Sequence, residues 1–325
     1  MDEFSLINQW FNCSQLQPHT QHIILGNGDD CAVIDVPEGC LLAQSIDTYI
    51  AEKHFPKNAP AKLIAIRTLS ASLSDLAATG AEPHSFSVAI SLPEADQNWL
   101  QPFSEGLALL AQKYNITLIG GDTTCGPLCL SFHVQGFVPA KKILTRSGAK
   151  PGDRIFVSGT LGNGAGALPL VLSGKLWQLD VSDREQQEEN CLLKAYYAPQ
   201  PQFVLGRWLS DNGVRTAIDI SDGLLADLGH ILISSQTGAT LDINTIPLSS
   251  SLLNSYGLQE ARDFALTGGD DYQLCFCWPK QKIFPEGCPV SVTEIGVITD
   301  RQGIIDTKGK RYAPQGFNHF SCPGL

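Results

Sequence analysis

A glycine-rich turn that leads into two adjacent carboxylates is a stretch whose residue types could do chemistry. It reads GNGDD over residues 26–30, and an apolar run at 31–36 follows it directly. Glycine lets a backbone turn sharply and approach a ligand closely, while neighbouring carboxylates repel each other unless a cation or hydrogen-bond donors neutralise them. Gly, Asn and Asp are also ordinary turn residues, so the five residues alone are equally consistent with a surface turn.

Further aspartates come at the ends of apolar segments. Asp47 and Asp219 end expected strands, and Asp122 follows two glycines after another. Asp75 lies at the edge of the apolar stripe of an expected helix. Ligands of α/β folds gather at the carboxyl ends of strands, and Mg²⁺ prefers carboxylate oxygens, completed by water and substrate phosphates. The pattern predicts a magnesium site and phosphoryl chemistry, although one such aspartate by itself is usually a cap or turn residue.

Three other stretches could contact an anion. The glycines of residues 120–122 leave backbone N–H groups free to face a phosphate. Arg146 could bind phosphate through its planar guanidinium or be a solvated linker charge, and His54 could bind phosphate or be a surface histidine. There is no GxxxxGK[ST] motif, and the glycines at 159–164 have the wrong spacing for a dinucleotide fingerprint. We interpret 159–164 as a turn before a helix.

Composition excludes several classes of protein. The 325 residues carry a net charge of −11, from 22 basic and 33 acidic residues, which argues against nucleic acid as a partner. There is no apolar run of about 20 residues that could span a membrane, and the N-terminus does not resemble a signal peptide. The ten cysteines lack zinc-site spacing. We expect a cytoplasmic protein whose cysteines are mostly small buried residues.

Strand and helix patterns alternate along the chain, which indicates α/β layers with mixed sheets. A basic, polar connector at 141–153 contains the turn signal Pro-Gly-Asp, and we predict two domains, 1–148 and 149–325. Residues 173–190 are polar and are expected to be irregular. Helices are expected at 2–12, 60–78, 102–114, 200–210 and 224–234. Strands are expected at 31–36, 40–46, 85–92, 116–119, 128–138, 154–158, 217–220, 239–243, 272–278 and 290–298.

Eight motifs occur in an order that resembles the thiamine-monophosphate kinase family. They are LGNGDDCA at 25–32, SIDT at 45–48, HF at 54–55, LSDLAATGA at 73–81, LIGGDTT at 118–124, LTRSGAKPGD at 144–153, IDISDG at 218–223 and GGDDY at 268–272. The similarity runs from about residue 4 to residue 320, so it covers nearly the whole chain. The combination is specific, whereas no single motif is.

The resemblance implies an architecture like that of aminoimidazole ribonucleotide synthetase. The N-terminal α/β domain would pair its sheet with that of a second subunit to form a homodimer, and the C-terminal α/β domain would complete a substrate cleft. The implied reaction transfers the γ-phosphoryl group of ATP directly and in line to thiamine monophosphate with several Mg²⁺ ions. The product is thiamine diphosphate, and the reaction is the last step of its biosynthesis.

The resemblance also implies roles for particular residues. The expected Mg²⁺ ligands are Asp30, Ser45, Asp47, Asp75, Asp122, Asp219 and Asp222. The expected ATP contacts are Gly121, Asp122, Arg146 and Ser221, and the expected thiamine monophosphate contacts are His54, Asp270 and Phe317. No residue is assigned as a general base. This chain has Ile46 where the family often has Thr, Asp270 where Glu is usual, and Phe317 where Tyr or Trp is common.

Four alternatives remain beside this one. Selenophosphate synthetase needs a reactive cysteine or selenocysteine in a glycine-rich N-terminal loop, and Cys13 has no such context. The hydrogenase-maturation dehydratase ends on a reactive cysteine, whereas three residues follow Cys322. Aminoimidazole ribonucleotide synthetase is the nearest enzymatic alternative. A non-catalytic Mg-nucleotide sensor is the alternative from another class, and intact carboxylates at the expected metal positions argue against it.

Overall fold

The computed structural model describes residue 7 and residues 9–18, 20–178 and 184–317. The chain forms two compact units. The first contains the described residues up to Leu76 together with Ala81–Ala140, and the second contains Ala77–Gly80 and the described residues from Lys141 onward. The domain boundary at 148/149 stays a prediction. Most of the helix expected over 2–12 and the residue Cys322 lie outside the described residues.

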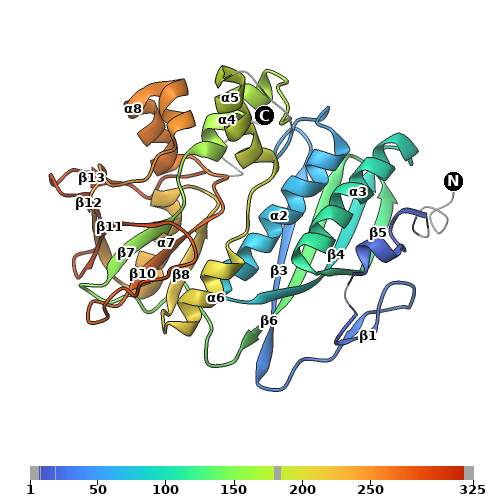
Figure 1. The fold of residues 1–325 in the computed structure, drawn as a ribbon, viewed down its shortest axis with the longest axis horizontal. Coiled ribbons are helices and arrows are strands. Elements are labelled where there is room, and N and C mark those ends of the chain that lie inside the picture. Colours follow the sequence, from blue (N-terminus) through green and yellow to red (C-terminus); the bar gives the residue numbers. More distant parts are fainter. Residues whose placement is uncertain (1–6, 8, 19, 179–183, 318–325) are drawn as a thin grey trace. The chain divides into compact units, whose positions relative to one another are not determined.

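The described part of the first unit is built on a four-stranded mixed sheet in the order β3-β6-β4-β5. Strand β4 pairs antiparallel with β6 and parallel with β5, and α2 and α3 run along this sheet (Figure 1). The elements are η1 (Ser14–Leu16), β1 (Ile23–Leu25), β2 (Val33–Ile34), β3 (Cys40–Ile50), α2 (Ala61–Thr79), β4 (Glu82–Leu92), α3 (Gln97–Tyr114), β5 (Thr117–Cys125) and β6 (Cys129–Pro139).

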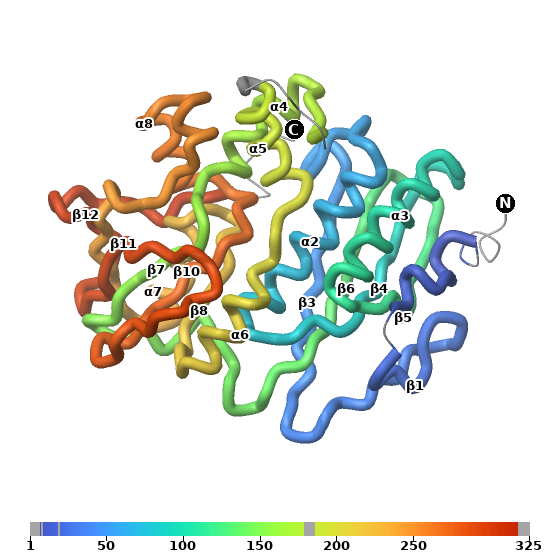
Figure 2. Tube along the Cα trace, in the orientation of Figure 1, coloured from blue at the N-terminus to red at the C-terminus, as the bar shows by residue number. Residues whose placement is uncertain are grey.

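The second unit contains a seven-stranded sheet, within the described residues, in the order β13-β12-β9-β11-β7-β10-β8. Figure 2 traces this unit from green through yellow to red along the chain, and residues 221–223 join β8 to α7. The elements are β7 (Arg154–Ser158), α4 (Asn163–Leu172), α5 (Arg184–Tyr197), α6 (Phe203–Asp211), β8 (Thr216–Ile220), α7 (Leu224–Ser235), β9 (Gly238–Leu241), α8 (Ser250–Thr267), β10 (Gln273–Trp278), β11 (Val292–Thr299), β12 (Gly303–Asp306) and β13 (Arg311–Tyr312).

The alternation of side chains along β8 divides the core of the second unit into two layers. Ile218 and Ile220 pack in one cluster with residues of α7. Ala217 packs in another cluster with Leu205 and Leu209 of α6. Because successive strand residues point to opposite faces, α7 and α6 cover opposite faces of the sheet, and the buried Asp219 lies on the face of Ala217. The prediction of α/β layers with mixed sheets is confirmed.

Several expected boundaries are wrong. α3 begins at Gln97 rather than at Pro102, because Asp96 caps it by accepting the backbone N–H of Asn98. The strand expected at 31–36 is reduced to Val33–Ile34. Residues 173–190 are not irregular throughout, because α5 begins at Arg184.

α8 was not predicted by the sequence patterns. None of the described helices is long and apolar enough to cross a membrane.

The expectation that Asp47 and Asp122 end strands is also wrong. β3 pairs with β6 as far as Ile50, three residues beyond Asp47. β5 pairs with β4 as far as Cys125, three residues beyond Asp122. In both cases a neighbouring strand continues to supply hydrogen-bonding partners, so the strand extends past the polar residue. Asp219 does lie near a strand end, since β8 finishes at Ile220.

Candidate functional site

Three predicted metal ligands meet between β3 and α2 in the first unit. Residues 45, 47 and 49 lie on one face of β3 because side chains alternate along a strand. The hydroxyl of Ser45 donates to Oδ2 of Asp75, with 2.5 Å between the oxygens. The Tyr49 hydroxyl lies 3.3 Å from Oδ2 of Asp47 and 3.0 Å from Oγ of Ser72. The result is an oxygen-rich cluster that contains two carboxylates.

The two carboxylates of this cluster oppose each other electrostatically. Burial, reinforced by the charge of Asp75, raises the pKa of Asp47 to about 6, although hydrogen bonds from Ser72 and Tyr49 act in the other direction. A divalent cation would relieve that opposition, and an all-oxygen donor set suits Mg²⁺. The donor chemistry therefore fits the predicted ion. In the described parts of the chain no three His, Cys, Asp or Glu side chains converge closely enough to hold a metal.

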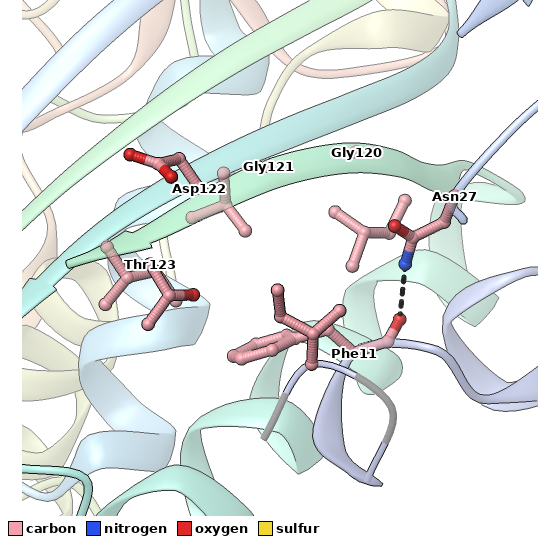
Figure 3. Close-up of a pocket in the computed structure, with 10 residues that line it drawn as sticks. Phe11, Asn27, Gly120, Gly121, Asp122 and Thr123 are labelled. Carbon is pink, nitrogen blue, oxygen red and sulfur yellow. Dashed lines mark hydrogen bonds between the residues drawn. The ribbon is translucent and has the colours of Figure 1, made fainter. Parts of the chain in front are cut away.

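Gly121 and Asp122 lie within β5 beside a small pocket of about 50 Å³ in the first unit. Gly121 stands opposite Val88, and a side chain there would clash with the Val88 carbonyl. Glycine is thus required at position 121 at least in part because the backbone lies close to strand β4 there. The pocket is lined by Ile7, Phe11, Asn27, Val88, Ile90, Leu118, Gly120, Gly121, Asp122 and Thr123 (Figure 3).

One side of that pocket is closed by a hydrogen bond that sequence reasoning missed. The Asn27 side-chain amide donates to the Phe11 carbonyl at 3.1 Å, and Figure 3 shows both residues across the pocket from Asp122. Asn27 belongs to the glycine-rich turn at 26–30, so this turn contributes a pocket wall. Asp30, at the end of the same turn, is exposed, and its backbone N–H donates to the Asp29 carboxylate at 2.9 Å.

His54 follows β3 and has a defined ring orientation. Nδ1 accepts the backbone N–H of Ile50 at 2.9 Å, and the ring makes an edge contact with Tyr49, with 5.7 Å between centroids. A neutral imidazole that accepts at Nδ1 carries its proton on Nε2. Nε2 itself is buried, so this N–H donor is not presented at the surface.

Four predicted residues of the second unit are joined by backbone hydrogen bonds. The Asp270 N–H donates to the Ser221 carbonyl at 2.9 Å, and the Phe317 N–H donates to the Asp222 carbonyl at 3.0 Å. Gly269 allows this approach, because a side chain there would clash with the Ser221 carbonyl. The structure thus brings predicted ATP and metal residues beside predicted thiamine monophosphate residues.

Asp270 is held in an unusual conformation. Its φ is 71°, and that of Tyr272 is 50°, a region that non-glycine residues adopt rarely and at some cost. The Tyr272 hydroxyl donates to Oδ1 of Asp270 at 3.0 Å. The backbone conformation and this hydrogen bond together limit where the carboxylate can go, and such strain is frequent at functional sites.

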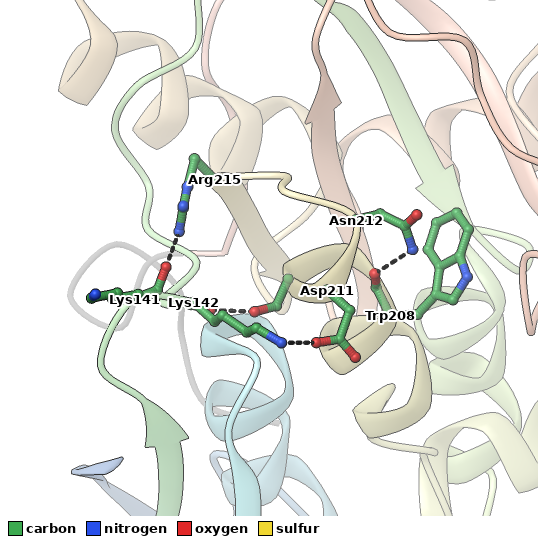
Figure 4. Close-up of polar contacts among 7 residues, drawn as sticks. Lys141, Lys142, Trp208, Asp211, Asn212 and Arg215 are labelled. Carbon is green, nitrogen blue, oxygen red and sulfur yellow. Dashed lines mark hydrogen bonds and ion pairs between the residues drawn. The ribbon is translucent and has the colours of Figure 1, made fainter. Parts of the chain in front are cut away.

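Arg146 belongs to a segment that is anchored and not a free linker. Thr145 donates its N–H to the Arg215 carbonyl at 2.8 Å and accepts the N–H of Ala217 at 3.0 Å. Upstream, the Lys142 ammonium pairs with Asp211 at 2.6 Å, and Arg215 donates to the Lys141 carbonyl at 2.5 Å (Figure 4). The Arg146 side chain is exposed. Its guanidinium is therefore presented from a fixed backbone.

The glycine-rich turn at 159–164 precedes α4, as predicted, but its N–H groups are already used. The Asp271 carboxylate accepts the N–H of Gly162 at 2.7 Å and that of Gly164 at 3.3 Å. Burial raises the pKa of Asp271 to about 7. A carboxylate of the chain itself thus fills the place where a helix N-terminus could receive an anion.

The two halves of the chain match the two domains of one class of protein. Residues 28–138 match the AIR synthase related protein, N-terminal domain. Residues 150–307 match the AIR synthase related protein, C-terminal domain. The chain is therefore an AIR synthase related protein.

Full-length relatives define the family within this class. The chain is 40% identical to the thiamine-monophosphate kinase of Escherichia coli strain K12 over 99% of each chain. A crystal structure of thiamine-monophosphate kinase from Stenotrophomonas maltophilia K279a is 39% identical with a TM-score of 0.84, and the match covers 96% of this chain and 98% of that one. AaThiL complexed with AMPPCP and TMP is 27% identical with a TM-score of 0.78, over 98% and 97% of the two chains. The chain belongs to the thiamine-monophosphate kinase family. This membership confirms the resemblance drawn from the motifs and, with it, the prediction of an enzyme.

Proposed function

We propose that this chain phosphorylates thiamine monophosphate with ATP to give thiamine diphosphate, the last step of thiamine diphosphate biosynthesis. The observation that carries the proposal is the similarity to thiamine-monophosphate kinases along the whole chain, at 40% identity to one of them. A related protein, AaThiL, has been solved in complex with AMPPCP and TMP. A cytoplasmic location stays a prediction from the sequence.

The proposed chemistry needs no general base. A phosphate monoester has its second pKa at about 6 and is mostly dianionic at neutral pH, so an oxygen of thiamine monophosphate can attack directly. A bond forms from this oxygen to the γ-phosphorus of ATP, while the bond to the β,γ-bridging oxygen breaks in line with it. ADP leaves with that electron pair. The enzyme's task is then to align the two substrates and offset their repulsion.

We assign the predicted residues to that task. The carboxylates Asp30, Asp47, Asp75, Asp122, Asp219 and Asp222, with the Ser45 hydroxyl, would hold several Mg²⁺ ions, and bound Mg²⁺ would neutralise negative charge on both substrates. The Arg146 guanidinium would bind an ATP phosphate in a bidentate manner. His54 and the carboxylate of Asp270 would orient thiamine monophosphate, and the Phe317 ring would pack on its cationic ring system.

The nucleotide base would occupy the pocket beside Gly121 and Asp122. Its lining combines apolar side chains, including Phe11, Ile90 and Leu118, with the polar edge of Asn27. A purine has an apolar face and polar edges, so this combination suits it.

We also propose a homodimer formed through the open face of the four-stranded sheet. Ile46 lies between Ser45 and Asp47, which face α2, so it points to the opposite face. Its side chain is 67% exposed, and Ile50, on the same face, is 44% exposed. Isolated apolar residues at a surface are common, but on a sheet face they suit pairing with the same face of a second copy.

A direct assay tests the reaction. The purified protein is mixed with ATP, Mg²⁺ and thiamine monophosphate, and the thiamine species are separated by chromatography. Thiamine diphosphate should appear only when ATP and Mg²⁺ are present, and not from free thiamine. ADP release without thiamine diphosphate would redirect the proposal to another AIR synthase related substrate, beginning with that of aminoimidazole ribonucleotide synthetase. ATP binding without turnover would favour the sensor.

A further inference from the structure

The loop between β8 and α7 closes around one buried carboxylate oxygen. Oδ2 of Asp227 lies 3.1, 3.0 and 3.1 Å from the backbone nitrogens of Ser221, Asp222 and Gly223. Asp227 is 2% exposed and sits in the first turn of α7, so its side chain reaches back over the N-terminal end of its own helix. Successive N–H groups that face one point form a concavity that binds anions. Here the carboxylate of Asp227 occupies that concavity.

This arrangement restricts how the loop can contact a phosphate. The N-terminus of a helix is otherwise a ready anion site, but the N–H groups of the three loop residues already donate to Asp227. Ser221 is therefore left to contact ATP through its hydroxyl rather than through its backbone. The hydrogen bonds fix the backbone from which the Ser221 hydroxyl and the Asp222 carboxylate project.

The same loop residues also hold the predicted thiamine monophosphate contacts. The carbonyl of Ser221 accepts the Asp270 N–H, and the carbonyl of Asp222 accepts the Phe317 N–H. Ser221 and Asp222 are thus bonded to Asp227 through their N–H groups and to Asp270 and Phe317 through their carbonyls. A shift of this loop would displace residues predicted for ATP, metal and acceptor together.

We propose that Asp227 is a positioning residue for phosphoryl transfer, which holds Ser221, Asp222, Asp270 and Phe317 in one arrangement through the β8–α7 loop. It touches no substrate. The inference rests on the proposed function, because the roles of those four residues do. No sequence motif pointed to Asp227, since its importance depends on where the three N–H groups converge.

Asp153 provides a matched control. It is also buried, at 8% exposure, and it also accepts backbone N–H groups, from Lys150 at 2.9 Å and Lys280 at 3.2 Å. It holds a turn of the second unit that contains none of the four residues. Asp227→Ala and Asp153→Ala each remove a buried carboxylate that accepts backbone N–H groups, so both should lower the melting temperature.

The test compares the two variants with wild type, well below both melting temperatures. Asp227→Ala should lower kcat by about 100-fold, the scale expected when reacting groups are misplaced by about 1 Å. It should also weaken calorimetric binding of thiamine monophosphate measured without ATP. Asp153→Ala should keep kcat and binding within about twofold, since it removes only stability. Equal effects of the two substitutions on kcat and binding would overturn the proposal.

Amide hydrogen exchange of the ligand-free wild-type protein gives a second test that needs no variant. The amides of residues 221–223 should exchange slowly, because all three donate to a buried oxygen. Rapid exchange would overturn the inference even if Asp227→Ala does not fold. Failure of this inference can be told apart from failure of the proposed function. A wild-type protein that makes no thiamine diphosphate refutes the reaction, whereas normal turnover with rapid amide exchange refutes only the role of Asp227.

Discussion

The hydroxyl of Ser45 donates to the carboxylate of Asp75 across 2.5 Å and so joins strand β3 to helix α2. The two residues are 30 positions apart in the sequence, and neither has an obvious partner until the sheet and helix pack. With Asp47 beside them, they form an oxygen-donor group that contains two like-charged carboxylates.

Asp75→Asn should lower kcat by about two orders of magnitude or more, since charge neutralisation by a bound metal contributes several kcal/mol to such transition states. The fold should remain intact, because the amide can still accept the Ser45 hydroxyl. Steady-state kinetics across a Mg²⁺ titration, with circular dichroism, would measure both effects. Glu105→Gln, at an exposed position of α3, is the control. Near-normal turnover of the Asp75 variant at saturating Mg²⁺ would contradict the shared-metal site.

Phe317→Ala should raise the KM for thiamine monophosphate more than it lowers kcat. The ring is 40% exposed although its N–H is fixed to Asp222, so a ligand can reach it. Loss of a cation–π contact worth about 0.5–2 kcal/mol corresponds to roughly a 2- to 30-fold change. Initial rates at varied acceptor concentration check this. Phe317→Tyr keeps the ring and should behave like wild type, while an unchanged KM in the alanine variant would remove Phe317 from the site.

Asp271 should make stability fall as pH rises. Its native pKa is raised from 3.8 to about 7 by burial, so between these values the native state binds more protons than the unfolded state. Stability from this group is complete below about pH 4 and is lost as the pH rises through 7. Asp271→Asn removes the titration. The melting temperature of the variant relative to wild type should therefore increase between pH 5 and pH 8, and parallel curves for the two proteins would show that the carboxyl does not titrate there.

Ile46→Asp should convert a dimer into a monomer. The residue is 67% exposed on the open face of the sheet. In the dimer, the negatively charged side chains of the two copies would then meet on this face. Sedimentation equilibrium measures the mass directly. Ile233→Asp, at a position of α7 that is 73% exposed, adds the same charge elsewhere and should leave the mass unchanged. A wild-type monomer, or a dimer that survives Ile46→Asp, would refute the proposed interface.

Local patterns identified much of the fold. The apolar stripe and the flanking Pro60 and Gly80 predicted a helix over 60–78, and α2 spans Ala61–Thr79. The motifs along the chain were sufficient to recognise the family, because each is a short run of adjacent residues. Periodicity and turn signals depend on near neighbours, so they are present in the sequence itself.

The tertiary structure decided what depends on distant partners. β3 and β5 extend past Asp47 and Asp122 because neighbouring strands continue to pair with them. Asp227 and Asp271 gain their importance from N–H groups that converge on them when helices and strands pack. The sequence alone thus determined which positions carry aspartate and in what order they come. Only packing decided which carboxylates face each other and which ones accept backbone N–H groups. Hydrogen bonds form between groups that the fold brings within about 3 Å.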